Sequence, residues 1–364
     1  MKDNKKERKQ FVDIAKGICI LLIARGHLNY DFFPSWLNEN EFYTIWYVSA
    51  FMLIAGFFCK ENDLYNPIVT LKKKGKALYL KSLYFFIPAT LLHNFFINNG
   101  LLSPNIPLYI SIKDWVIAFG KVFAGLSFEK MVEPLWFALA LFEGFVCLSL
   151  ILWTLKRFHL NTFKVETICL VTLMCLSCYI NNYTDIHLPP RYGSAITSMF
   201  LIYLGKKIFK EYAQTFASRF FALLSFIILL MYTFTIGSIN KGYLIGMIIN
   251  QYPDVVTLII GSLAGMYLTL FIGKRLEGSL IGNIIAKCGK ESFYIMALHM
   301  FFYRVLILYF NDYIGAFIDG EGSIFPNSLG GFSFLFLASV ILVLIFVYCV
   351  RLIINYVRFR QVKF

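Results

Sequence analysis

Charged residues are scarce in this chain, and acidic residues are scarcer than basic ones. Only 15% of its 364 residues are charged, with 21 Asp and Glu against 34 Lys and Arg. Ordinary soluble domains have about 25% charged and about 45–50% apolar residues. Here 59% of the residues are hydrophobic and 18% are aromatic. This composition excludes an ordinary soluble globular protein.

Long, nearly uncharged runs recur from Phe11 to Tyr356, and runs of about 18 or more apolar residues are typical of transmembrane helices. We therefore expect an all-α polytopic membrane protein, a bundle of about ten transmembrane helices forming one domain over residues 1–364. The stretch 104–125 is amphipathic and interrupted by glycine, which is typical of an interfacial or re-entrant segment. The first run contains charges and is followed by no small-residue cleavage site, which indicates an anchor. The expected spans are 11–30, 42–59, 77–98, 134–155, 165–182, 192–209, 217–237, 253–273, 292–311 and 331–357.

The expected outer loops, where disulfide bonds would form, contain no cysteine. All eight cysteines fall in the expected helices or near the inner face, and none falls in an outer loop. Cys175 and Cys178 form a C-x-x-C within one expected helix, with no second pair to complete a metal or redox site. The sequence thus predicts neither structural disulfides nor a bound metal.

Basic residues divide unequally between the two sides of the expected membrane. With a cytoplasmic N-terminus, the inner segments carry 25 Lys and Arg, the outer loops five and the helices four. This distribution follows the positive-inside rule and supports an even number of helices, so both termini are expected in the cytoplasm. Attraction to anionic lipid of an inner or plasma membrane explains the net charge of +13 without a nucleic-acid partner.

The first expected helix carries ionisable residues in the stretch "DIAKGICILLIARGH". Lys16 and His27 are 11 residues apart, which places them within about 20° on one face and roughly 16 Å apart along the axis. Asp13 precedes Lys16 by three residues and can pair with it on the same stripe. Ionisable residues in membrane helices are usually functional. The alternatives are that Lys16 snorkels to the headgroups and that His27 only bonds another helix.

This helix resembles the start of the membrane acyltransferase-3 family, which includes bacterial sugar O-acetyltransferases. Members typically have a basic residue, ten residues and then His, in a pattern that Asp13, Lys16, Gly17, Gly26 and His27 fit. Three further stretches are similar to family motifs, "FMLIAGFF" (51–58), "LWFALALF" (135–142) and "ESFYIMALHMFF" (291–302). The F-H-M-P of many members is replaced by the sequence WYVS at 46–49, so a second histidine is lost there.

The resemblance implies transfer of an acetyl or similar acyl group from acyl-CoA to a hydroxyl of a cell-surface carbohydrate. His27 is the expected general base, because a hydroxyl is a weak nucleophile at neutral pH. Lys16 and Asp13 complete the expected catalytic group. Acetyl-CoA is cytoplasmic and polyanionic, so inner-face lysines suit its phosphates. The expected donor-binding residues are Lys73, Lys74, Lys76 and Lys81.

Four intramembrane residues are expected to bind the substrate: Trp136, Glu143, His299 and Arg304. Each has a structural alternative, which is packing for Trp136, an ion pair for Glu143, and interhelical bonding for His299 and Arg304. The acceptor is expected to enter through the loops 29–41 and 99–133. The rival function is export of a polysaccharide or lipid-linked sugar, against which the lack of two matched broken helices argues. The sequence indicates neither the acceptor glycan nor an oligomeric state.

Overall fold

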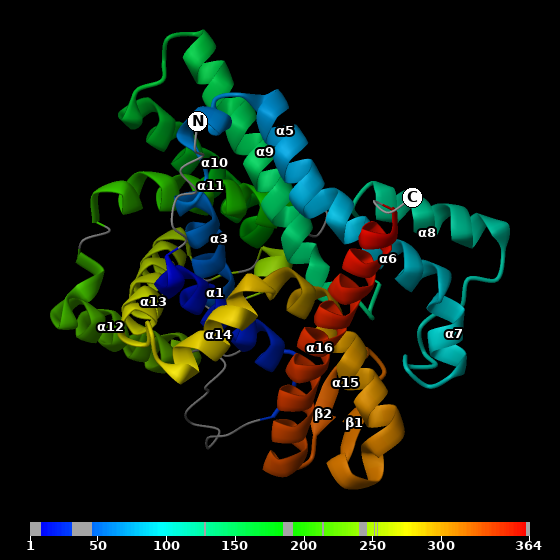
Figure 1. Ribbon diagram of the computed structural model, residues 1–364. Helices are drawn as coiled ribbons and strands as arrows, with labels where there is room; N and C mark the ends of the chain where they lie inside the picture. The colour runs from blue at the N-terminus through cyan, green and yellow to red at the C-terminus, as the bar shows by residue number, and fades with distance from the viewer. Residues whose placement is uncertain are drawn as a thin grey trace. The chain divides into compact units, whose positions relative to one another are not determined.

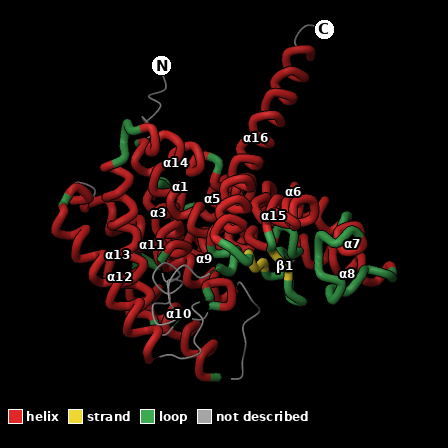
Figure 2. Tube along the Cα trace, turned by 90° about the horizontal axis from the view of Figure 1, so that it is seen from below, coloured by secondary structure: helices red, strands yellow, loops and turns green. Residues whose placement is uncertain are grey.

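The computed structural model is almost entirely helical, with one small pair of strands (Figure 2). It describes residues 9–30, 46–126, 129–184, 192–212, 215–239, 246–250, 252 and 254–361. Part of the expected acceptor entrance at 29–41 therefore lies outside the described residues. Figure 1 labels most of the elements.

The helical elements begin and end close to the expected apolar runs. Their bounds are α1 Gln10–Arg25, α3 Tyr47–Phe57, α4 Glu61–Leu64, α5 Pro67–Lys74, a π-helical turn Gly75–Tyr79, α6 Leu80–Leu91, α7 His93–Asn98, α8 Ile112–Phe123, a 3₁₀ turn Glu133–Leu135, α9 Trp136–Arg157, α10 Phe163–Tyr183, α11 Tyr192–Tyr212, a 3₁₀ turn Thr215–Ala217, α12 Arg219–Ile239, a 3₁₀ turn Met247–Ile249, α13 Val255–Arg275, α14 Leu280–Lys290, α15 Ser292–Ile314 and α16 Leu329–Gln361. The two strands are β1 Ala316–Ile318 and β2 Ile324–Pro326.

The all-α polytopic membrane class is confirmed. Within the described residues, five helices are long and apolar enough to cross a membrane: Glu133–Arg157, Phe163–Asn181, Val255–Arg275, Ser292–Ile314 and Leu329–Val357. Tyr47–Phe57 and Arg219–Phe234 are shorter apolar helices. The expected third span, 77–98, is divided between the π-helical turn, α6 and α7, and α6 and α7 meet at Leu92. The count of ten spans stays a prediction.

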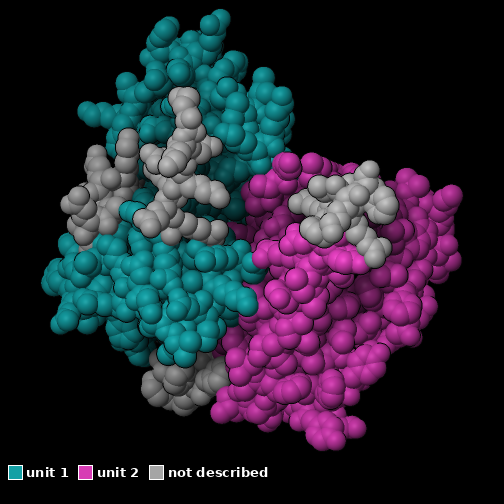
Figure 3. Space-filling view, in the orientation of Figure 1, with its two compact units in different colours: residues 1–22, 33–75, 140–292 teal, residues 23–32, 76–139, 293–364 magenta. Residues whose placement is uncertain are grey.

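The chain forms two compact units, each assembled from three separate segments (Figure 3). Unit 1 contains residues 1–22, 33–75 and 140–292, and unit 2 contains residues 23–32, 76–139 and 293–364. The stretch 104–125, expected to be amphipathic, contains α8, which begins with a capping box between Ser111 and Asp114. Its exposed apolar residues include Val116 and Phe123, as expected of an interfacial helix.

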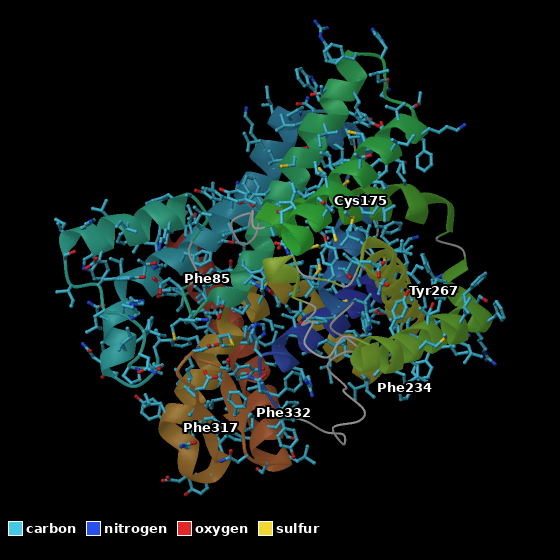
Figure 4. All side chains as sticks on the ribbon, turned by 180° about the vertical axis from the view of Figure 1, so that it is seen from behind. Phe85, Cys175, Phe234, Tyr267, Phe317 and Phe332 are labelled. Carbon is cyan, nitrogen blue, oxygen red and sulfur yellow. The ribbon has the colours of Figure 1, made fainter. Side chains whose placement is uncertain are left out.

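In unit 1, α3 packs tightly against α11 through two glycines. A Cβ added to Gly56 would lie 2.1 Å from the carbonyl oxygen of Ile202, and one added to Gly205 would lie 2.0 Å from that of Leu53. Only glycine therefore permits this backbone approach, as is common between membrane helices. α13 packs against both α3 and α12, and Tyr267, labelled in Figure 4, belongs to α13.

Unit 2 gathers α15, α16 and the β-hairpin around one apolar cluster. The strands pair antiparallel, with Ala316 opposite Pro326, and the rings of Phe317 and Phe325 stack 4.9 Å apart. Leu28 forms an isolated parallel bridge with Ile324, and the amide of Asn29 donates to the Ile324 carbonyl at 2.8 Å. The hairpin thus holds the chain directly after His27.

A buried polar cluster in unit 2 joins α7 to the loops before and after α8. The His93 Nδ1 lies 2.9 Å from a Glu129 carboxylate oxygen and its Nε2 lies 3.0 Å from the Pro107 carbonyl oxygen. The Tyr109 hydroxyl donates to the other Glu129 oxygen at 2.8 Å, and its ring stacks on His93 at 3.9 Å. Since a carboxylate and a carbonyl can only accept, both ring nitrogens carry protons and His93 is an imidazolium.

The α3–α11 contact predicts that Gly205→Ala destabilises the protein. The added methyl group has no space, and overpacking costs typically about 1–3 kcal/mol. The matched control is Gly120→Ala in α8, where an added Cβ meets no atom within 4 Å. Thermal unfolding in detergent should show a lower midpoint for Gly205→Ala alone. Equal midpoints for the two variants would contradict the close packing.

The buried imidazolium predicts a stability that declines at alkaline pH. Burial disfavours the charged ring, but the Glu129 and Pro107 hydrogen bonds outweigh it, so the pKa of His93 is raised above its ordinary value. The stabilisation is complete below the unfolded pKa, about 6.5, and is lost as pH rises through the raised folded pKa. His93→Gln should flatten this dependence and lower the unfolding free energy by about 1–3 kcal/mol, since Glu129 loses a charged partner. Chemical unfolding across pH 6–9 checks this, and an unchanged slope in the variant would refute it.

Candidate active site

His27 lies just beyond the C-terminal end of α1, where the helix leaves carbonyl groups without helical partners. Its ring Nδ1 is 2.8 Å from the carbonyl oxygen of Ile23, one turn earlier. Because a carbonyl only accepts, Nδ1 must carry the proton, and in the neutral ring Nε2 then has a lone pair. The helix that carries His27 thereby sets its tautomer, and Nε2 is the atom able to accept a proton.

A second histidine lies beside it. His299, in α15, is completely buried, and its ring centroid is 5.0 Å from that of His27. Its Nδ1 lies 2.7 Å from the carbonyl oxygen of Ile295, and its Nε2 lies 3.4 Å from the His27 Nδ1. One turn later, the Tyr303 hydroxyl donates to the Ala24 carbonyl at 3.0 Å. α15 therefore contacts the end of α1 through two residues on one face.

Arg304 follows on α15 and is also completely buried. Its guanidinium donates from Nη1 to the Leu101 carbonyl at 3.2 Å and from Nη2 to the Gly322 carbonyl at 2.8 Å. Within the described part of the chain, its Nε has no hydrogen-bond partner. Gly322 has a φ of +89°, and a Cβ there would lie 3.3 Å from Nη2. Arg304 thus ties the hairpin and the 99–103 segment to α15.

Among the described residues, charged side chains that act electrostatically on His27 include Glu133, Arg304 and Lys130. Lys130 and Glu133 form an ion pair at 3.2 Å directly before α9. Sequence reasoning missed both residues, because Lys130 lies in a loop, Glu133 begins the 3₁₀ turn before α9, and neither belongs to a motif. The available signal was an acid two residues before the "LWFALALF" stretch.

The other two members of the expected catalytic group lie in unit 1, on the first half of α1. Asp13 is buried, and the Lys16 ammonium lies 5.1 Å from the centre of the Phe58 ring. A Cβ added to Gly17 would lie 2.1 Å from the carbonyl oxygen of Ile285 in α14. α1 and α14 therefore approach closely at Gly17.

Two of the four residues expected to bind substrate lie on α9. Trp136, the first residue of α9, is buried, and its ring centroid lies 6.1 Å from that of Phe137. Glu143 is half-buried two turns later. The structure brings His299 to His27 and sets the charge of Arg304 near it.

The lysines expected to bind the donor have different surroundings. Lys73 is exposed and forms an ion pair with Asp63 at 2.8 Å. Lys74 lies 3.6 Å from the centre of the Phe145 ring, and burial lowers its pKa. Lys76 is exposed in the π-helical turn. Lys81, in α6, lies over the rings of Phe293 and Tyr294 at 4.2 and 4.1 Å.

The arrangement provides a base whose acceptor atom is set by a backbone carbonyl, with two cations and one carboxylate acting on it. Such a group can remove a proton from a hydroxyl and return it to a leaving group. Among the described residues, no group of three or more His, Cys, Asp or Glu side chains could hold a metal ion.

The family model of the acyltransferase domain known as acyltransferase-3 matches residues 9–351. The chain belongs to the acyltransferase-3 family. It is therefore an acyltransferase of the kind that transfers groups other than amino-acyl groups, and the resemblance of its first helix is confirmed. The matched region begins before α1, ends within α16 and contains every candidate residue described above. No curated protein and no solved structure matches the chain.

Proposed function

We propose that this acyltransferase-3 member moves an acetyl or similar acyl group from acyl-CoA to a hydroxyl of a cell-surface carbohydrate. His27 is the general base. The observation that carries the proposal is the 2.8 Å contact between its Nδ1 and the Ile23 carbonyl oxygen. That contact leaves the lone pair on Nε2, where an incoming hydroxyl can be met. Membership of an acyltransferase family supplies the reaction class.

In the proposed reaction, His27 is the one side chain that moves the proton between the two substrates. The His27 Nε2 takes the proton of the acceptor hydroxyl while that oxygen attacks the thioester carbonyl carbon. The C–S bond then breaks, and the imidazolium returns the proton to the CoA thiolate. The products are an ester and free CoA. Lys130 and Arg304, which act electrostatically on His27, supply positive charge suited to the oxyanion of the tetrahedral intermediate.

The donor is proposed to approach from the cytoplasmic side, where the basic loops are expected and where CoA is found. Lys73, Lys74, Lys76 and Lys81 are the proposed contacts for its phosphates. Lys81 has aromatic neighbours, and Arg351 lies over one of them, with its guanidinium 5.9 Å from the Tyr294 ring centre. A cation flanked by rings suits both the phosphates and the adenine of CoA.

The acceptor is proposed to enter from the opposite side, near the loops that contain Lys130 and Tyr109. Trp136, Glu143 and Arg304 stay proposed as acceptor-binding residues, with Lys16 and Asp13 as supporting residues of the first helix. A carbohydrate can donate hydroxyl hydrogen bonds to a carboxylate such as Glu143 and can lay its apolar C–H face against an aromatic ring such as that of Trp136.

His27→Ala is expected to abolish acyl transfer while leaving membrane insertion intact. General base catalysis contributes about 10²–10⁴-fold, so the loss should be of that order. The assay is the transfer of labelled acetyl from acetyl-CoA to a panel of cell-surface glycans. His159→Asn serves as the control, because His159 lies in a turn with a φ of 59° that Asn tolerates. A His27→Ala protein that retained more than half of wild-type activity would overturn the assignment.

A triple variant in which Lys73, Lys74 and Lys76 are each replaced by Gln should have a higher KM for acetyl-CoA and a nearly unchanged KM for the glycan. Each exposed phosphate contact contributes roughly 1 kcal/mol or less, so single changes should be almost silent. Asp63→Asn is the matched control, since it breaks the Lys73–Asp63 ion pair without removing positive charge. Calorimetry with CoA at low salt measures the binding directly. Unchanged CoA affinity in the triple variant would show that these lysines serve topology and packing only.

A further inference from the structure

The contact between two ring nitrogens, the His27 Nδ1 and the His299 Nε2, has a consequence for the reaction. We propose that His299 is a positioning residue, a neutral imidazole whose Nε2 accepts from the His27 Nδ1–H and stabilises the charge that His27 gains during transfer. This inference rests on the proposed role of His27 as general base. In this role His299 contacts the base, His27, and does not contact the substrate.

The protonation of His299 follows from its partners. Its Nδ1 lies 2.7 Å from the Ile295 carbonyl oxygen and must donate there. Its Nε2 faces the His27 Nδ1 at 3.4 Å, and that atom already carries a proton because it bonds the Ile23 carbonyl. A proton on the His299 Nε2 would set one N–H against another. His299 is therefore a neutral acceptor, and the two rings together hold at most one additional proton.

His299 has no ring nitrogen left to bind a substrate. The ring is completely buried in the fold, and each of its nitrogens already faces a partner, Ile295 on one side and His27 on the other. A hydroxyl or carbonyl of a substrate could reach it only by displacing one of these contacts. His27, in contrast, is partly exposed.

The gain to the reaction comes when His27 becomes an imidazolium. Its positive charge is shared by both N–H groups, and Nδ1–H then faces two acceptors, the Ile23 carbonyl and the His299 Nε2. A hydrogen bond to a charged group is stronger than one to a neutral group. The other charges acting on His27 are Glu133, which favours the imidazolium, and Arg304 and Lys130, which oppose it. The His299 acceptor offsets part of that opposition.

α15 holds His299 in this position through a second contact on the same face. Tyr303 is four residues later, and its hydroxyl donates to the Ala24 carbonyl at 3.0 Å. The rings of His299 and Tyr303 lie 5.6 Å apart, nearly perpendicular. The His299 ring is thus fixed by its own Ile295 bond and by a neighbour that is anchored to α1.

Two amide variants test the contacts of the two His299 ring nitrogens separately. His299→Asn places its amide near the former Nδ1, so it can keep the Ile295 bond but presents no acceptor to His27. His299→Gln is longer and can place its carbonyl oxygen near the former Nε2. We expect kcat to fall about 10- to 100-fold for Asn, the worth of one hydrogen bond to a charged group. KM for both substrates should be unchanged, and Gln should recover most of the activity.

A second measurement does not depend on catalysis. Diethyl pyrocarbonate carbethoxylates histidine rings, and mass spectrometry can measure how far His27 is modified at each pH. The reagent modifies a neutral imidazole, so the labelling curve reports when His27 takes its extra proton. The curve for His299→Asn should move to lower pH than that of the wild type, and the curve for Gln should lie near the wild type.

The outcomes distinguish the inference from the proposed function. If the wild type transfers acetyl to no glycan while the labelling curve still moves in Asn, the proposed function fails and the histidine pair stands. A raised KM with unchanged kcat in Asn would overturn the positioning role in favour of substrate binding. Unchanged kcat and an unmoved labelling curve would also overturn it. If Asn does not fold, a folded Gln protein with kcat at or below about a hundredth of wild type contradicts the inference, and one near wild type supports it.

Discussion

The proposed site depends on one hydrogen bond, from the His27 Nδ1–H to the carbonyl of Ile23. The last turn of a helix leaves carbonyl groups that need partners. The amides of His27 and Leu28 bond to Ala24 and Arg25, while the His27 ring satisfies Ile23. The same bond fixes the tautomer of the ring. A requirement of helix termination thereby produces a base with its lone pair on the opposite atom.

The rest of unit 2 holds this ring in place. Leu28 is bridged to Ile324 in the hairpin, and Arg304 donates to the Gly322 carbonyl within the hairpin turn. Tyr303 bonds the carbonyl of Ala24. The helix end, α15 and the hairpin are thus joined by polar contacts made inside an apolar cluster. Such contacts are costly to lose in a buried setting, because each would leave a polar group without a partner.

The sequence predicted the helical membrane class and the family, and it singled out His27, but it placed His27 inside a first helix over 11–30, whereas α1 ends at Arg25. These predictions follow from local signals, which are apolar run length and the spacing of Lys16 and His27. The partnership of His27 with His299 could not be predicted, because the two residues are 272 positions apart and periodicity carries no information on which helices meet. Lys130 and Glu133 were missed because they lie just before α9, outside any motif. The Asp63 partner of Lys73 depends on how α4 and α5 fold back on each other, which charge patterning alone does not give.

The central claim, that His27 removes the acceptor proton, is tested most directly by chemical rescue of the His27→Ala protein with added imidazoles. A general base obeys a Brønsted relation, so its effectiveness depends on its basicity. If His27 is the base, small imidazoles should restore acetyl transfer, and the restored rate should rise with the pKa of the additive among molecules of similar size. Restoration that followed size alone, with no dependence on basicity, would show that the His27 ring only fills space and that it does not act as the base.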